Sequence, residues 1–533
     1  MDKAQIGIMI SIVAYLSVVV IIGVIYSKRT KNVGDFYLGG RKLGPLVTAM
    51  SAEASDMSSW LLMGLPGVAY LTGIADAGWT AIGLAFGTYV NWLVVAKRLR
   101  NYSEKIGAIT VPDFFAKRYK DDSNILLGLS ALVIIIFFVP YTASGFSACG
   151  KLFATLFGIS YHKAMIISAI VIVAYTSLGG FNAASTTDFI QSVIMTVALI
   201  IVLVFGVSKA GGLGAVADNA KSLPGFLDMF NMHSVTADEK TGIISGGSSP
   251  YTVLTIFTTL AWGLGYFGMP HILLRFMAIE DAKKIKLSRR VASVWVVISM
   301  GIAVFIGVVG NALVKAGKIS IDIISKLDKT TGTYNLDDTD KETVIIKIAD
   351  LLSNQSFILA LVAGIILAGI LASTMSTADS QLLAASSSMS ENIMGGLFKF
   401  KLSGTAQMVV ARATLIVVSV IAVIIALNEE SKVFEIVSFA WGGFGAAFGP
   451  AMLLALFWKK SNRYGAMAGM RTGVATIFIW KFVVRPMGGI WDIYELLPAF
   501  IIALVANVIV SLISRDTNDP EMVETFEEVK AMK

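Results

Sequence analysis

The sequence predicts an all-α polytopic membrane protein. Of its 533 residues, 56% are hydrophobic and only 15% are charged, and the mean hydropathy is +0.75. An ordinary soluble domain carries about 25% charged residues. Apolar runs of about 20 residues, long enough to cross a bilayer as helices, recur along almost the whole chain. These observations exclude a soluble protein and predict one transmembrane domain, residues 1–514, followed by a short cytoplasmic tail, 515–533.

About thirteen apolar runs are candidate membrane-spanning helices. The first is too long for a cleaved signal, and no small-residue cleavage site follows it. Two long loops, 209–251 and 315–350, are expected to be solvated connectors, and the tail is expected to form a short surface helix. The expected spans are 6–26, 46–70, 75–96, 125–149, 162–180, 187–208, 252–275, 291–314, 356–388, 407–427, 433–457, 464–484 and 494–513.

Basic residues gather in alternate loops, which predicts that these loops are cytoplasmic. The N-terminus is then expected outside the cell and the C-terminus inside, and the net charge of +7 reflects these loops rather than nucleic-acid binding. The residues behind this assignment are Lys28, Arg29, Lys31, Arg41, Lys42, seven residues between Lys97 and Lys120, Arg275, Lys283, Lys284, Lys286, Arg289, Arg290, Lys459, Lys460 and Arg463.

Residues able to do enzyme or metal chemistry are scarce. Cys149 is the single cysteine, and the chain has only three histidines, so a Cys/His metal cluster is not expected. No nucleophile and base pair can be assembled from them either. The sequence therefore predicts neither an enzyme nor a zinc or haem protein.

Polar residues interrupt the second span between Ser51 and Trp60, and two of them are the acids Glu53 and Asp56. An ionised carboxylate in the membrane costs at least about 2.5 kcal/mol, so Asp56 needs a cation, a partner or water. Ser and Asp also favour local unwinding, which is tolerated where the backbone lines a protein cavity. Tight packing of small residues is the alternative, but it explains only the serines.

The seventh span, 252–275, contains the stretch Trp262 to Pro270, whose three glycines and one proline predict a second broken helix. Trp262 and Tyr266 share a face and offer π surfaces to an ammonium group, although core packing alone would also explain them. The two broken spans lie five helices apart and run in opposite directions. This pattern is typical of two inverted five-helix repeats, here about 46–208 and 252–457, around a mid-membrane substrate site.

The ninth span presents Ser373, Ser376, Thr377 and Ser380 on one helical face, beside Asp379. Hydroxyl and carbonyl oxygens suit a hard cation, but hydroxyls also bond back to their own helix. A further acid, at position 188, opens the sixth span, where it is either functional or simply an N-cap.

These stretches resemble the sodium/solute symporter family, most closely its sodium/proline symporters, over nearly the whole chain. The resemblance implies a LeuT-type core with 5+5 inverted repeats, formed by helices 2 to 11 with three additional helices. The stretches that carry it are Leu38–Leu43 (LGGRKL), Ser55–Gly67 (SDMSSWLLMGLPG), Trp262–Met277 (WGLGYFGMPHILLRFM), Met375–Thr377 and Ser438–Pro450 (SFAWGGFGAAFGP).

The resemblance also implies Na⁺ as the coupling ion and L-proline as the substrate, carried into the cell by alternating access. The implied sodium ligands are the carbonyls of Ala54, Met57 and Ser373 and the side chains of Ser376 and Thr377, with Asp56 needed for coupling. The implied substrate-site residues are Ser58, Tyr141, Trp262, Tyr266 and Pro270, and Arg41 is the implied gating residue.

Departures from the familiar proline pattern leave alternatives open. Glu53 and Ser59 stand where glycines are usual, and Asp379 with Ser380 replaces an uncharged pair. Because some family members hold a second sodium near this position, a second cation or proton site at Asp188, Asp379 and Ser380 is our hypothesis. The alternative is a symporter of another small zwitterion or organic solute, coupled to sodium or protons. A membrane sensor built on a transporter body is less favoured, because it would need an output domain and the tail 515–533 resembles none. A channel would need a selectivity filter, and the sequence shows no recognisable one.

Overall fold

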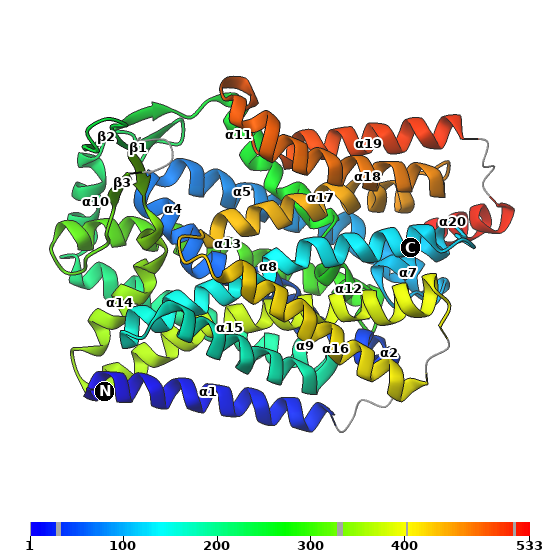
Figure 1. Ribbon diagram of the computed structural model, residues 1–533, viewed down its shortest axis with the longest axis horizontal. Helices are drawn as coiled ribbons and strands as arrows, with labels where there is room; N and C mark the ends of the chain where they lie inside the picture. Colours follow the sequence, from blue (N-terminus) through cyan, green and yellow to red (C-terminus); the bar gives the residue numbers. More distant parts are fainter. Residues whose placement is uncertain (1, 28–32, 328–333, 401–402, 515–518, 533) are drawn as a thin grey trace.

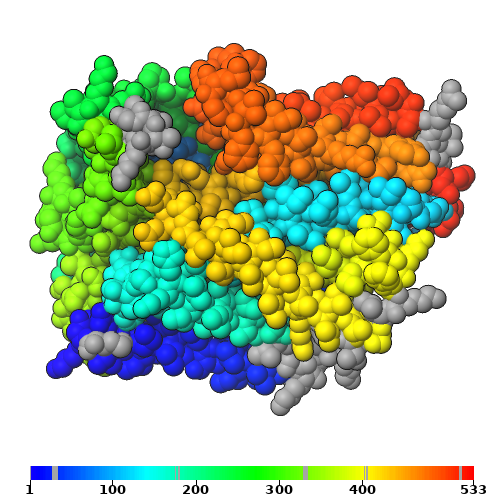
Figure 2. Space-filling view, viewed as in Figure 1, coloured from blue at the N-terminus to red at the C-terminus, as the bar shows by residue number. Residues whose placement is uncertain are grey.

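The computed structural model describes residues 2–27, 33–327, 334–400, 403–514 and 519–532. Most helices run along the long axis of the molecule, and two antiparallel β-hairpins lie at one end (Figure 1). We call this the hairpin end, and the opposite end, where α20 lies, the tail end. The surface view shows α1 lying along α9, although they are far apart in the sequence (Figure 2).

The first half of the chain forms, over its described residues, helices and one β-hairpin, joined by loops. Its elements are α1 (Lys3–Ser27), α2 (Val33–Leu38), η1 (Gly39–Arg41), α3 (Pro45–Asp56), η2 (Trp60–Gly64), α4 (Leu65–Thr72), α5 (Ile74–Val90), η3 (Asn91–Ala96), α6 (Lys97–Lys105), α7 (Val111–Arg118), α8 (Ile125–Phe157), α9 (Tyr161–Lys209), α10 (Leu213–Ser222), β1 (Asn231–Ala237), β2 (Ile244–Pro250), α11 (Val253–Leu260), η4 (Ala261–Phe267) and α12 (Pro270–Ala278).

The second half repeats this pattern of long helices with one small hairpin. Its elements are η5 (Ala282–Lys284), α13 (Ile285–Lys315), β3 (Ile324–Leu327), β4 (Tyr334–Asp337), η6 (Thr339–Thr343), α14 (Val344–Ser353), α15 (Phe357–Ser387), η7 (Ser388–Leu397), α16 (Gly404–Ala426), α17 (Val433–Phe457), α18 (Arg463–Ile479), η8 (Trp480–Val484), η9 (Arg485–Met487), η10 (Gly489–Trp491), α19 (Leu496–Ile513) and α20 (Pro520–Ala531).

The helices confirm a polytopic membrane fold, but not the count of thirteen. Among the described residues, ten helices are long and apolar enough to cross a membrane, and the bent pair α11–η4 and α12 makes eleven. The expected span 46–70 is divided among α3, η2 and α4. The expected span 162–180 is the first part of α9, which continues across a kink at Gly180, where φ is +66°.

Three expectations about loops need correction. The charge pattern predicts a cytoplasmic loop at Arg275, but this residue lies inside α12 and is only 1% exposed. Its burial is tolerated because buried polar side chains bond its guanidinium. The loop 315–350 is not only a solvated connector, since α14 buries Val344, Ile345 and Ile346. Likewise, the loop 209–251 contains α10 and the hairpin of β1 and β2.

Some residues named in the sequence analysis lie outside the described residues. They are Lys28, Arg29, Lys31 and the start of the tail, 515–518.

The expected surface helix in the tail is present as α20. Its Met522, Phe526 and Val529 are buried, and Phe526 lies under the guanidinium groups of Arg98 and Arg118. The alternation of acidic and apolar residues in the tail therefore corresponds to one docked face and one solvated face.

Candidate substrate and ion site

The break in the second span begins where α3 ends at Asp56. Met57 donates its N–H to the Glu53 carbonyl at 2.8 Å, and Ser58 donates to the Asp56 carbonyl at 2.8 Å. A π-helical turn then begins at Trp60. Serine and aspartate stabilise such turns by competing for backbone hydrogen bonds, so the polar run places an irregular backbone in the buried interior.

The residues predicted to bind sodium lie between α3 and α15. Ser376 Oγ donates to the Ala54 carbonyl at 2.8 Å and also lies 3.1 Å from the Ser373 carbonyl. Thr377 Oγ1 donates to the same Ser373 carbonyl at 3.1 Å. Met57 lies in the turn after α3. These buried hydroxyl and carbonyl oxygens have the chemistry of a hard-cation site.

Asp56 links the same turn to the other broken helix. Tyr266 Oη donates to Asp56 Oδ2 at 2.6 Å, and Tyr141 Oη donates to the Asp56 carbonyl at 3.3 Å. Trp60 Nε1 donates to that carbonyl at 3.2 Å. Ser58 is buried beside them. Three predicted site residues, Asp56, Tyr141 and Tyr266, are therefore brought together from three different elements.

The second broken helix bends by 45° between η4 and α12. Pro270 occupies the first turn of α12, where its missing N–H has no helical partner to lose. Trp262 on η4 stacks on Tyr494 with ring centroids 5.0 Å apart and contacts Phe434 at 5.3 Å. A cavity of about 730 Å³ reaches this aromatic cluster, and Trp262, Phe434 and Tyr494 line it.

Trp441 packs behind Trp262, and we call the five rings of Trp262, Tyr266, Phe434, Trp441 and Tyr494 the aromatic wall. Trp441 Nε1 donates to the Trp262 carbonyl at 2.8 Å, and its ring meets Tyr266 edge-on at 4.9 Å. Sequence reasoning missed Trp441, Phe434 and Tyr494 as site residues. Trp441 stands within the Ser438–Pro450 stretch and could have been found there, whereas the other two reach the site only through long-range packing.

The hypothesised second cation site contains a fixed positive charge. Arg275 Nη2 lies 3.0 Å from Asp188 Oδ2 and donates to Ser380 Oγ at 2.6 Å. Ser51 Oγ donates to the same Asp188 oxygen at 2.7 Å, and Ser380 donates to Asp379 Oδ1 at 3.2 Å. Asp188 therefore lies inside α9 as an ion-paired residue, and its interpretation as an N-cap is wrong.

Arg41 lies at the tail end and joins three segments. Its guanidinium donates to the Met277 carbonyl of α12 at 2.6 Å and to the Ser103 carbonyl of α6 at 3.0 Å. It also donates to the Ala108 carbonyl at 2.5 Å. These bonds tie the end of the broken helix to the segment between α6 and α7.

A bundle of membrane-length helices, with two helices broken around buried polar groups, is the architecture of many secondary transporters. The sequence model of the sodium:solute symporter family matches residues 36–473, and the chain belongs to that family. It is therefore a multi-pass membrane transporter and not an enzyme.

Curated relatives match almost end to end. The osmoregulated proline transporter OpuE of Bacillus subtilis (strain 168) is 39% identical over 513 residues, which cover 96% of this chain and 96% of the relative. The high-affinity proline transporter PutP of the same organism is 39% identical over 497 residues, 93% of this chain and 96% of the relative. The sodium/proline symporter of Staphylococcus aureus is 38% identical over 513 residues, 95% of this chain and 92% of the relative.

Solved structures agree on the fold. A Na⁺-coupled sialic acid symporter, solved in a substrate-bound outward-open state, superposes with a TM-score of 0.74 at 17% identity, covering 96% of this chain and 99% of the other. MHP1, a nucleobase-cation-symport-1 family transporter in a closed conformation, superposes with a TM-score of 0.53 at 13% identity, covering 94% of this chain and 100% of the other.

Proposed function

We propose that the protein is a symporter that couples the entry of L-proline to the entry of Na⁺. The observation that carries this proposal is the cluster of Ala54, Ser373, Ser376 and Thr377 oxygens beside the aromatic wall around Trp262. The proline transporters among the relatives, similar over nearly their whole length, support the choice of substrate.

The charge balance of the interior also supports a cation. Glu53, Asp56, Asp188 and Asp379 are all buried in α3, α9 and α15, and Arg275 ion-pairs with one of them. Buried carboxylates in a membrane protein need cations or protons. Sodium between α3 and α15, held by Ala54, Met57, Ser373, Ser376 and Thr377, supplies one such charge.

Substrate binding uses the neighbouring aromatic wall. The pyrrolidine ring of proline packs on Trp262 and Tyr266, and its ammonium group faces their π surfaces. Its carboxylate binds backbone amides at the breaks, in the first turn of α12 after Pro270 and in the turn containing Ser58, whose own N–H would exchange its bond to the Asp56 carbonyl for the substrate. Tyr141 closes the site from α8 through its bond to Asp56.

The transport cycle that we propose is alternating access in two inverted five-helix repeats, about 46–208 and 252–457, within about thirteen spans of the cell membrane. The N-terminus faces outward and the tail faces the cytoplasm, so Arg41 belongs to the cytoplasmic gate. Sodium favours the outward-open state and completes the substrate pocket, which is coupling through differential affinity. Each inward sodium gains about 2.3 kcal/mol per 100 mV of membrane potential.

The experiment that tests this proposal is uptake of labelled proline into proteoliposomes under an inward sodium gradient, with potassium and proton gradients as controls. Accumulation that requires sodium supports it. Sodium-coupled uptake of another zwitterion, with proline ignored, would refute the substrate, and uptake driven by protons alone would refute the coupling ion.

A second cation or proton site is proposed at Asp379, next to Ser380 and Asp188. Arg275 already supplies the positive charge at Asp188, whereas Asp379 Oδ2 is buried without a hydrogen-bond partner among the described residues. The measured ratio of sodium to proline tests this site. A ratio of one that is unchanged in Asp379→Ala would exclude it.

A further inference from the structure

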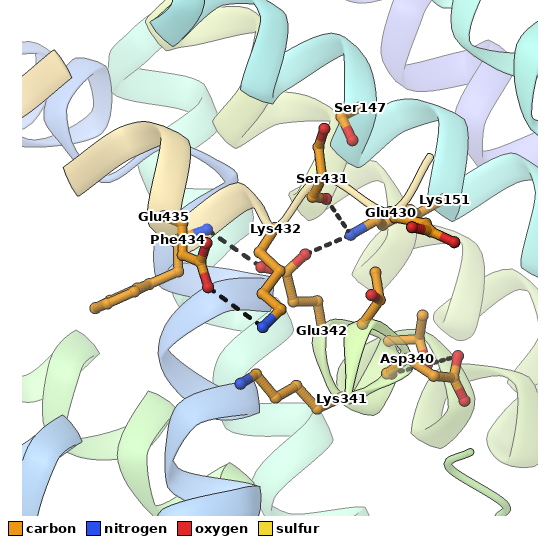
Figure 3. A network of polar contacts seen from close by, with 12 residues as sticks. Ser147, Lys151, Asp340, Lys341, Glu342, Glu430, Ser431, Lys432, Phe434 and Glu435 are labelled. Atoms are coloured by element: carbon orange, nitrogen blue, oxygen red, sulfur yellow. Dashed lines mark hydrogen bonds and ion pairs between the residues drawn. The ribbon is translucent and has the colours of Figure 1, made fainter. Parts of the chain in front are cut away.

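A buried ion pair joins three segments at the hairpin end. Lys151 on α8 lies 2.6 Å from Glu342 on η6, and their side chains are 7% and 0% exposed (Figure 3). The Lys151 ammonium also donates to the Ser431 carbonyl at 2.8 Å, just before α17. One charged cluster thus connects α8, the η6 turn and the start of α17.

The second oxygen of Glu342 takes the place of a helix cap. Glu342 Oε1 accepts the backbone N–H of Phe434 at 3.2 Å, in the first turn of α17. The N-cap residue Lys432 has no side-chain cap of its own. An acceptor with negative charge is favoured at this position because the first amides of a helix are unpaired and carry partial positive charge.

The residue held in this way forms part of the aromatic wall. The ring centroids of Phe434 and Trp262 lie 5.3 Å apart, and Phe434 lines the same 730 Å³ cavity. Gly64 lies against it, since a methyl group there would come within 3.1 Å of the Phe434 Cβ. Glu342 therefore bonds the backbone that carries the Phe434 ring, and it contributes no atom to the lining of that cavity.

We propose that Glu342 is a positioning residue for substrate binding, which holds Phe434 as the wall of the pocket facing the hairpin end. This inference rests on the proposed function, because it takes Trp262 as a substrate-site residue. Stability alone explains the ion pair poorly, since a buried pair is often no more stabilising than well-packed apolar residues. The Lys151–Glu342 pair also holds the start of α17 in place through its bonds to Ser431 and Phe434.

The test compares proline uptake by Glu342→Gln, Phe434→Leu and the double variant, each normalised to the amount of protein in the membrane. Glu342→Gln keeps one oxygen acceptor but loses the charge, and Phe434→Leu leaves the ion pair intact. We expect each single change to raise the KM for proline about three- to tenfold, the range of one buried aromatic contact. Vmax per molecule and half-saturating sodium should change less than about twofold.

The double variant distinguishes positioning from a general structural role. If Glu342 acts through Phe434, the double variant has the KM of Phe434→Leu alone, because the two changes remove one interaction. The control is Glu430→Gln in the loop just before α17, which breaks an exposed ion pair with Lys326 on β3 and should leave the KM unchanged. The inference is overturned if Glu342→Gln lowers only protein amount or Vmax, if Phe434→Leu leaves the KM unchanged, or if the two effects add.

Failure of the proposed function would be recognised separately. If the wild type takes up no proline but carries another solute, the proposed substrate fails, and the same KM comparison made with that solute still tests Glu342. If the wild type carries proline and Glu342→Gln has the wild-type KM, only the inference fails.

Discussion

Removing the Ser376 hydroxyl is the most direct perturbation of the proposed sodium site. Ser376→Ala deletes the group that bridges the Ala54 carbonyl on α3 at 2.8 Å and the Ser373 carbonyl on α15 at 3.1 Å. Alanine favours helix and fits where serine stood, so α15 should remain intact. The change therefore removes one proposed ligand from the ion, together with the hydrogen bond that this hydroxyl makes between α15 and α3.

The magnitude follows from the type of bond lost. Interactions between a polar group and a charged partner contribute about 1.5–3 kcal/mol, and about 1.4 kcal/mol corresponds to a factor of ten in affinity. Half-saturating sodium should therefore rise about 10- to 100-fold in Ser376→Ala. The KM for proline, measured at sodium high enough to saturate the variant, should stay within about threefold of wild type.

The assay is initial proline uptake against sodium concentration, and the matched control is Ser373→Ala. The Ser373 hydroxyl donates to the Ile370 carbonyl of its own helix at 2.7 Å, so alanine there removes no proposed ligand and keeps the Ser373 carbonyl. The control should keep the wild-type sodium dependence. Equal shifts in the two variants, or no shift in Ser376→Ala, would refute the assignment of this site.

Three further outcomes follow from other parts of the structure. Arg275→Gln leaves Asp188 buried and unpaired, which should destabilise the purified protein by about 3–5 kcal/mol, and adding Asp188→Asn should recover part of the loss in thermal unfolding midpoint. Gly265→Ala would place a methyl group inside the indole ring of Trp441 on α17. The amount of folded protein extracted from the membrane, measured as the monodisperse peak in size-exclusion chromatography, should therefore fall sharply. The pKa of Asp337 lies below its ordinary value, at about 2. Partial burial alone would raise this pKa, but the hydrogen bonds to the carboxylate, first the one from Lys326, lower it by more. A carboxylate with a lowered pKa stabilises the fold above about pH 4 and loses this effect as the pH falls towards 2, so hydrogen exchange in β4 should show the same protection at pH 5 and pH 7.

The fold was largely predictable because lipid imposes a simple rule on sequence. A helix that faces lipid must be apolar over about 20 residues, so spans such as 125–149 and 433–457 can be read locally. The break at Asp56 was also visible, since polar residues in a membrane segment must face protein or water. The α14 helix was missed because its run, Val344–Ser353, is too short to span a membrane and is buried against other helices.

The arrangement of the candidate site was predictable where one helix carries its residues, and less so where distant helices meet. The hydroxyl stripe of Ser373, Ser376 and Thr377 follows from helical spacing alone. The role of Arg275 was missed although a charged residue inside an apolar run is itself a signal. Glu342 stands in a loop rich in charges, and nothing local distinguishes it from its neighbours. Its proposed role rests on contacts with Lys151 and Phe434, which lie far away in the sequence.

The turn after α3 explains how an ion and a solute could affect each other in the proposed cycle. The Ala54 carbonyl faces Ser376, whereas Asp56, two residues later, bonds Tyr266 and Tyr141. A cation that orders the Ala54 carbonyl therefore also fixes the backbone that orients Asp56 and the aromatic wall. Because the effect is reciprocal, bound proline must raise the affinity for sodium by the same factor by which sodium raises the affinity for proline. In the proposed cycle the coupling resides in this one irregular turn and requires no contact between ion and substrate.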